Sequence, residues 1–212
     1  MSGIAGTLAG VVRQASEQRP NAVALVDDIG EVTFAELNQR ISATVAVVDG
    51  LLDAMVPVAV IGPNHRTWIE LYYAVPSSGR LLVFLNHRLH AQELAAMLDR
   101  SGAGIVVGNK ADLGRLRGVG VEVPMFDWAA WSAFVDGAEN EEVDRLLDPE
   151  SAAWLLFTSG TTAAPKGALL SHKGLLASVA ASTAARPVSA DDVYVFPFPL
   201  CHVAGYNVIH RH

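Results

Sequence analysis

The residues best suited to chemistry gather around position 160. They comprise four hydroxyl side chains, a glycine and a lysine: Thr158, Ser159, Gly160, Thr161, Thr162 and Lys166. Apolar runs at 152–157 and 167–170 flank them and predict two buried strands. Hydroxyl and backbone N–H groups donate hydrogen bonds to phosphate oxygens, glycine lets the backbone approach a ligand, and lysine supplies positive charge. The pattern predicts a turn between two strands that binds a polyphosphate.

Two other nucleotide-binding motifs do not fit the sequence. Counted from Gly160 in the Walker pattern G-x-x-x-x-G-K-[ST], Pro165 stands where the second glycine belongs, and Gly167 stands where the Ser or Thr belongs. The residues after Lys166 also favour a strand, whereas a Walker loop leads into a helix. The glycines at 102 and 104 precede a predicted strand instead of following one, which excludes a dinucleotide-binding fingerprint.

The stretch from Thr158 to Gly167 resembles the phosphate loop of the adenylate-forming superfamily, whose pattern is T-S-G-[ST]-T-G-x-P-K-G. One fixed position differs, because Ala163 replaces a glycine. The superfamily contains acyl-CoA synthetases, luciferases and the adenylation domains of peptide synthetases. A second segment, Pro199–Gly205, resembles the superfamily pattern P-L-F-H-x-x-G, with Cys201 where an aromatic residue is usual. His202 and Gly205 match, and this segment resembles acyl- or aryl-CoA ligases more than peptide synthetases.

The resemblance implies a two-step reaction. A carboxylic acid, such as a fatty acid, attacks the α-phosphorus of ATP, and a thiol, usually that of coenzyme A, then attacks the acyl-adenylate. ATP, Mg²⁺ and coenzyme A are the implied cofactors, and no metal-ligating residue is identified. The implied catalytic residues are Lys166, at the β- and γ-phosphates, and His202, beside the acyl carboxylate. The implied nucleotide-binding residues are Thr158, Ser159, Gly160, Thr161, Thr162, Lys166 and Gly167.

The later superfamily motifs do not occur in these 212 residues. We therefore expect the incomplete N-terminal domain of an acyl-CoA synthetase-like fold, which does not complete adenylation alone. Cutting such a domain leaves apolar faces and strand edges unpaired, so self-association is expected. Two alternatives stay open: a non-catalytic module that binds ATP or pyrophosphate, and an inactive gene remnant.

Composition narrows the function classes further. The net charge of −7 argues against non-specific nucleic-acid binding. The apolar stretches are too short to span a bilayer. A single cysteine, Cys201, excludes an internal disulfide and, with no basic signal sequence, favours a cytoplasmic protein. No base is placed to activate Cys201, so we interpret it as a packing residue or part of a pocket wall.

Strands and helices are expected to alternate and to position these residues. Predicted strands cover 22–26, 56–61, 80–85, 104–107, 119–125, 152–157, 167–170 and 191–196. Predicted helices cover 4–19, 34–48, 66–75, 91–100, 127–135 and 172–184, with Thr33 and Glu36 forming a capping box and Pro76 ending the third helix. The alternation predicts an α/β fold with a mostly parallel β-sheet flanked by helices. We divide the chain into a first α/β subdomain (1–150) and the phosphate-loop segment with the start of a second (151–212).

The remaining polar and aromatic residues admit less specific interpretations. Acidic residues between 139 and 150 indicate a solvated connection, with a metal site as the less favoured alternative. Trp128 and Trp131 are interpreted as packing residues instead of a ligand-stacking pair. The other histidines are interpreted as surface or capping residues (His65, His87, His90, His172) or as part of a tag remnant or frayed tail (His210, His212).

Overall fold

A computed structural model describes residues 6–139, 145–158, 165–202, 205 and 209. In chain order the elements are α1 (Ala9–Gln18), β1 (Val23–Asp27), β2 (Gly30–Thr33), α2 (Phe34–Leu51), β3 (Val58–Ile61), α3 (Arg66–Ser77), β4 (Leu82–Leu85), α4 (Ala91–Ser101), β5 (Ile105–Gly108), α5 (Lys110–Gly118), β6 (Met125–Asp127), α6 (Trp128–Asp136), β7 (Ala152–Thr158), β8 (Lys166–Ser171) and α7 (His172–Ala185). Within these residues no helix is long and apolar enough to cross a bilayer.

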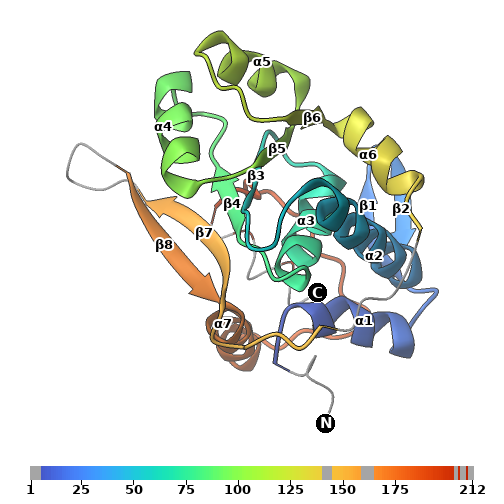
Figure 1. Cartoon of the computed structure of the whole chain (residues 1–212). Helices are drawn as coiled ribbons and strands as arrows, with labels where there is room; N and C mark the ends of the chain where they lie inside the picture. Colours follow the sequence, from blue (N-terminus) through green and yellow to red (C-terminus); the bar gives the residue numbers. More distant parts are fainter. Residues whose placement is uncertain (1–5, 140–144, 159–164, 203–204, 206–208, 210–212) are drawn as a thin grey trace.

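A six-stranded sheet forms the centre of the molecule (Figure 1), with the strand order β6-β5-β3-β4-β7-β8. Its first five strands are parallel, and β8 returns antiparallel to β7. The expected mostly parallel sheet flanked by helices is therefore confirmed. Strands β1 and β2 form a separate antiparallel ribbon. The division at residue 150 stays a prediction; β7 and β8 extend the sheet that contains β3–β6.

Helices cover the sheet on both faces, because alternate residues of its strands are apolar on both sides. On one face, strand residues such as Val60 and Phe84 pack against α1, α2, α3 and α6, through side chains that include Trp68 and Trp131. On the other face, strand residues such as Val83 pack against α4 and α5. The helices that follow β3 and β4 thus lie on opposite faces of the sheet.

Several predicted elements need correction. Strand β2 and helix α5 were not predicted, and the strand expected at 119–125 is wrong, since only Met125–Asp127 pair with β5. The strand expected at 191–196 is also wrong, because these residues form no strand and Val193 and Val195 are 90% and 85% exposed. An apolar run forms a strand only where a neighbouring strand pairs with it, and in the described part of the chain residues 191–196 belong to neither sheet.

Helix α3 continues past Pro76 to Ser77, although the sequence predicts its end at Val75. Proline lacks the N–H that would normally bond to the carbonyl group four residues earlier, which is that of Tyr72. The indole Nε1 of Trp154, on β7, donates to this carbonyl at 3.2 Å. A side chain from the neighbouring strand therefore supplies the donor that the proline lacks, and the helix keeps its last turn.

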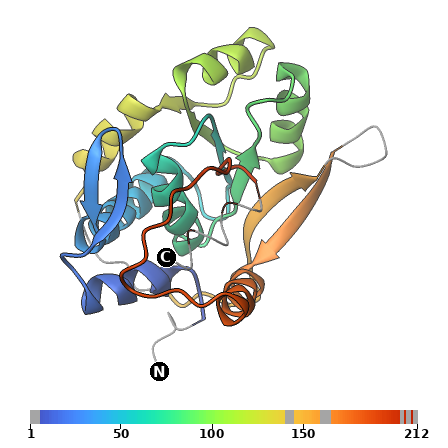
Figure 2. The same ribbon diagram turned by 180° about the vertical axis from the view of Figure 1, so that it is seen from behind.

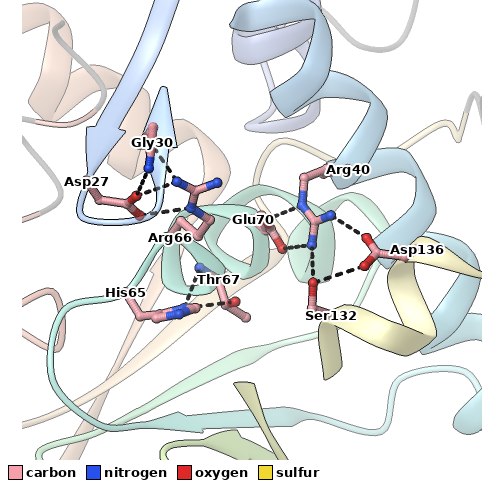
Figure 3. Close-up of polar contacts among 9 residues, drawn as sticks. All are labelled: Asp27, Gly30, Arg40, His65, Arg66, Thr67, Glu70, Ser132 and Asp136. Carbon is pink, nitrogen blue, oxygen red and sulfur yellow. Dashed lines mark hydrogen bonds and ion pairs between the residues drawn. The ribbon is translucent and has the colours of Figure 1, made fainter. Parts of the chain in front are cut away.

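Two arginines fasten the helices and the β1–β2 ribbon on one face of the sheet (Figure 3). Arg66, at the start of α3, bonds both carboxylate oxygens of Asp27 and the carbonyl of Gly30. Its hydrogen bond holds the pKa of Asp27 down, at about 2. Arg40 of α2 contacts Glu70 of α3 at 2.5 Å and Asp136 of α6 at 2.6 Å. These ion pairs fix α3, whose first residues lie directly after the loop that follows β3.

Candidate functional site

The carboxyl ends of the parallel strands β3, β4 and β7 lie at one edge of the sheet. Ligands of open parallel sheets bind at this edge, where the connections after neighbouring strands go to opposite faces. Strands β3 and β4 have this arrangement, since α3 and α4 pack on opposite faces. Strand β7, which leads into the predicted phosphate loop, is the next strand along. Strand β7 therefore ends, at Thr158, on the edge where a ligand is expected.

The β7–β8 hairpin brings two predicted site residues together. Thr158 and Lys166 are the last register pair of its ladder, and Thr158 Oγ1 donates to the Lys166 carbonyl oxygen at 3.3 Å. Both residues are exposed. Ser159, Gly160, Thr161 and Thr162, which complete the predicted loop, lie outside the described residues. Figure 1 shows the hairpin reaching outward beside α4.

Arg100 of α4 bonds the residue before Lys166, and no sequence motif indicates this contact. Its Nη1 donates to the carbonyl oxygen of Pro165 at 3.0 Å, directly before Lys166. A cavity of about 350 Å³ lies beside this contact, between α4 and the hairpin, and Met97 and Phe157 are among its lining residues. No local sequence signal links residue 100 to residue 165, so only the packing of α4 beside β7 and β8 reveals the contact.

Gly167, expected among the nucleotide-binding residues, has a packing role in the hairpin. A Cβ placed on it would lie 2.7 Å from Leu155 Cδ1 on the paired strand. Glycine at this position therefore leaves room for the Leu155 side chain on the face of the hairpin. The register of the ladder places Lys166 opposite Thr158.

The open end of the hairpin has donors that fit phosphate groups. Lys166 is exposed, and an exposed ammonium group can bind an external anion. Among the described residues no cluster of three or more acidic, histidine or cysteine side chains occurs. The hydroxyl of Thr158 and the ammonium group of Lys166 are groups that can bind a phosphate-bearing ligand, and we assign no step to a metal held by the protein.

The second predicted segment, around His202, is attached to the same edge of the sheet. Asn64, three residues after β3, donates from Nδ2 to the Phe198 carbonyl and accepts from the Leu200 N–H, both at 2.9 Å. Tyr72 of α3 donates to the Leu200 carbonyl. Figure 2 shows the chain after α7 running past α3. Exposed His202 follows, and its N–H donates to the Pro199 carbonyl at 3.0 Å.

The loop between β3 and α3 is tightly constrained. Gly62 has φ +141°, and a Cβ placed on it would lie 2.9 Å from Trp128 Cζ2. The ring of His65 stacks on Trp128 with centroids 4.9 Å apart, and its Nδ1 accepts the Thr67 N–H at 3.2 Å. Burial lowers the pKa of His65, which keeps this acceptor neutral. Trp128 thus packs against its own chain, as predicted.

The remaining predicted roles have mixed outcomes. His65 caps α3 through its ring nitrogen, and His90 stands at the exposed N-cap position of α4, so each fits the surface or capping interpretation. His172 is not a surface residue: it is 1% exposed, and its Nδ1 accepts the Leu8 N–H at 3.1 Å. Cys201 packs partly buried against the core, and burial raises the pKa of its thiol. His210 and His212 lie outside the described residues.

Comparison with known proteins identifies similar chains. The family description "AMP-binding enzyme" matches residues 12–210. A feruloyl-CoA synthase of Amycolatopsis is 29% identical over 202 residues, covering 90% of this chain and 38% of the relative. A long-chain-fatty-acid–CoA ligase of Thermus thermophilus is 32% identical over 192 residues, covering 84% of this chain and 35% of the relative.

A solved structure shows the same fold. The N-terminal domain of FACL13 from Mycobacterium tuberculosis superposes with a TM-score of 0.89 at 20% identity, covering 96% of this chain and 54% of that one. The matched part of the chain spans between 35% and 38% of the length of these two curated relatives.

Proposed function

The chain belongs to the AMP-binding enzyme family, and from this premise we propose that it is part of an enzyme that joins a carboxylic acid to coenzyme A. The acid would attack the α-phosphorus of ATP and expel pyrophosphate, and the coenzyme A thiol would then displace AMP from the acyl-adenylate. The similar chains include enzymes named for feruloyl-CoA and for long-chain fatty acids. We propose a fatty acid as the substrate. ATP and coenzyme A as co-substrates favour a cytoplasmic location.

The observation that carries this proposal is the pairing of Thr158 with Lys166 at the open end of the β7–β8 hairpin. The ammonium group of Lys166 would neutralise negative charge on the β- and γ-phosphates as pyrophosphate leaves. The Thr158 hydroxyl and the backbone N–H groups of the loop would donate to the same oxygens. Mg²⁺ bound to ATP would supply further charge neutralisation.

His202 is proposed to contact the acid. Its segment is held at the carboxyl end of β3 by Asn64, whereas the hairpin follows β7, and β4 lies between these two strands. An imidazole can donate a hydrogen bond to a carboxylate and can change its charge near neutral pH. A carboxylate near His202 and phosphates near Lys166 would place the reacting groups along one edge of the sheet.

Calorimetric titration with ATP and Mg²⁺ tests the loop assignment. We expect Lys166→Ala to weaken binding by about tenfold or more, since a charge-assisted hydrogen bond contributes roughly 1.5–3 kcal/mol. The matched control is Lys173→Ala, which removes the same charge near the other end of β8, where Lys173 pairs with Glu150 at 2.5 Å. Equal affinities for wild type and Lys166→Ala would remove the loop from the proposed function.

Catalysis by the 212-residue chain alone is a separate question. Because the matched part of the chain spans only 35% to 38% of the two curated relatives, we propose that it holds the nucleotide without completing adenylation. Carboxylate-dependent exchange of pyrophosphate into ATP at a normal enzymatic rate would contradict this. Nucleotide binding without exchange would support the alternative of a binding module, and absence of both would support an inactive remnant.

Self-association also stays a proposal, and light scattering would test it.

A further inference from the structure

The two hydrogen bonds between Asn64 and the C-terminal segment form a clamp across the fold. Asn64 Oδ1 accepts the N–H of Leu200, and Asn64 Nδ2 donates to the carbonyl of Phe198, each at 2.9 Å. The side-chain amide thus offers one acceptor and one donor to the backbone, as a neighbouring strand would. Only one orientation of the amide satisfies both bonds. The clamp therefore defines the position of residues 198–200, as well as attaching them.

The loop that carries Asn64 is held in place by contacts on both sides of this residue. Trp68 Nε1 donates to the carbonyl of Pro63 at 3.0 Å, so the residue before Asn64 is fixed to α3. The residue after Asn64 is His65, which stacks on Trp128. Gly62 leaves no room for a side chain beside the same indole. Asn64 therefore projects from a loop whose backbone is held on both sides, as a positioning group requires.

The segment that Asn64 holds follows a stretch without regular secondary structure, although Phe196 packs against the core and against Phe198. Residues 191–197 form no helix or strand, and Val193 and Val195 are almost fully exposed. The chain becomes buried again at Leu200, whose carbonyl also accepts from Tyr72 Oη. His202 follows two residues later, and its N–H bonds to Pro199 within the same turn. The turn that contains His202 therefore starts in the clamped residues.

We propose that Asn64 is a positioning residue, which acts through the 198–200 backbone to hold His202 where it meets the carboxylate of the acid. This inference rests on the proposed function, because it takes a carboxylic acid as the ligand of His202. Asn64 itself would touch no substrate. Its loss would therefore weaken acid binding only as far as His202 contributes to it.

Amide hydrogen exchange tests the positioning by itself, on the 212-residue chain. The N–H of Leu200 donates to Asn64 Oδ1, and the N–H of His202 donates to the Pro199 carbonyl within the turn, so the protection of the two amides reports the clamp and the order of the turn. We expect Asn64→Ala to speed exchange at both amides by about tenfold or more. Asn64→Asp keeps the shape and the acceptor but loses the donor, and should give a smaller increase. Unchanged exchange at both amides in Asn64→Ala would overturn the positioning role.

A matched control comes from the neighbouring strand. Asn86 follows β4, and its Oδ1 accepts only the nearby Arg88 N–H among the described contacts. Asn86→Ala should leave exchange at Leu200 and His202 unchanged. Equal acceleration in Asn86→Ala and Asn64→Ala would show a general loosening of the sheet edge and would overturn the proposal. Circular dichroism would confirm that each variant is folded, and Asn64→Asp serves if Asn64→Ala does not fold.

A double-mutant cycle tests whether Asn64 acts through His202. Octanoate is titrated into wild type, Asn64→Ala, His202→Ala and the double variant. We expect each single substitution to weaken octanoate binding by about fivefold or more, and the double variant to bind no more weakly than His202→Ala. Additive losses would show that Asn64 acts independently of His202, which would overturn the proposal. If wild type does not bind octanoate but the exchange result holds, the acid site fails and the positioning of His202 stands.

Discussion

Acidification should destabilise the protein through His172. This residue begins α7, is 1% exposed, and accepts the Leu8 N–H through Nδ1. That nitrogen can accept a hydrogen bond only when it is unprotonated. Burial lowers the pKa of His172 from 6.5 to about 4. Protonation would place a positive charge in the core and also break the contact between the N-terminal residues and α7.

The sign and magnitude follow from linkage. Between about pH 6.5 and pH 4 the unfolded chain binds a proton at His172 that the folded chain does not bind. The free energy of unfolding is therefore unaffected above pH 6.5 and falls as the pH drops through this window. A shift of about 2.5 pKa units corresponds to a loss of about 3 kcal/mol by pH 4. Such a loss is a substantial fraction of the stability of a typical domain.

Urea unfolding followed by tryptophan fluorescence, at several pH values from about 7.5 to 4.5, measures this loss. His172→Asn keeps an acceptor for Leu8 but has no titratable group, so most of the pH dependence should disappear. A smaller slope should remain, because burial also lowers the pKa of His65. The control is His90→Asn, at an exposed N-cap, which should keep the full slope. A wild-type slope as shallow as that of His172→Asn would refute the reasoning.

Two other substitutions test the ion pair of α3 with α2 and the constrained loop before α3, with the same unfolding assay. Glu70→Gln should lower the free energy of unfolding by about 2–3 kcal/mol, because Glu70 is 1% exposed and its loss leaves the Arg40 guanidinium without its closest carboxylate. The control Glu150→Gln, at an exposed ion pair, should lower it by less than about 0.5 kcal/mol. Equal losses would contradict the role of burial. Gly62→Ala should cost about 2–4 kcal/mol, since the backbone has φ +141° and the new methyl group would clash with the indole of Trp128. Gly50→Ala, in α2 with nothing within 4 Å, should instead be neutral or stabilising, and a loss there like that of Gly62→Ala would contradict the steric argument.

Local patterns in the sequence predict the frame of the fold well. Thr33 and Glu36 bond each other's backbone as the capping box requires, so the start of α2 follows from residues three positions apart. The apolar runs at β3, β4 and β5 are also local signals. Each of these strands is buried on both faces, so its residues are apolar without interruption and predict a buried parallel strand. Elements whose existence depends on a partner strand were less predictable. Strand β2 forms only as the second strand of a hairpin with β1, across residues 28 and 29, and residues 191–196 lack a partner strand among the described residues.

The candidate site divides in the same way. The hairpin with Thr158 and Lys166 is encoded within one short stretch, so its two strands could be predicted from the apolar runs, while the roles of the two residues stay a proposal. Arg100 contacts Pro165, which is 65 positions later in the chain, and Asn64 contacts Phe198, which is 134 positions later. Neither contact has a local signature in the sequence. His172 has a polar side chain at the start of a helix, where exposure is the usual outcome, and only the packing of the N-terminal residues shows that it is buried.

The hydrogen bond from Trp154 to the Tyr72 carbonyl means that positions 76 and 154 do not tolerate change independently. With proline at 76, any residue at 154 that lacks a donor leaves a buried carbonyl without its partner. With alanine at 76, the helix would satisfy that carbonyl itself, and the indole N–H would have to share its acceptor. The residue that suits one position thus depends on the residue at the other, although they are 78 positions apart and lie in different elements. Related chains should therefore show correlated substitutions at this pair.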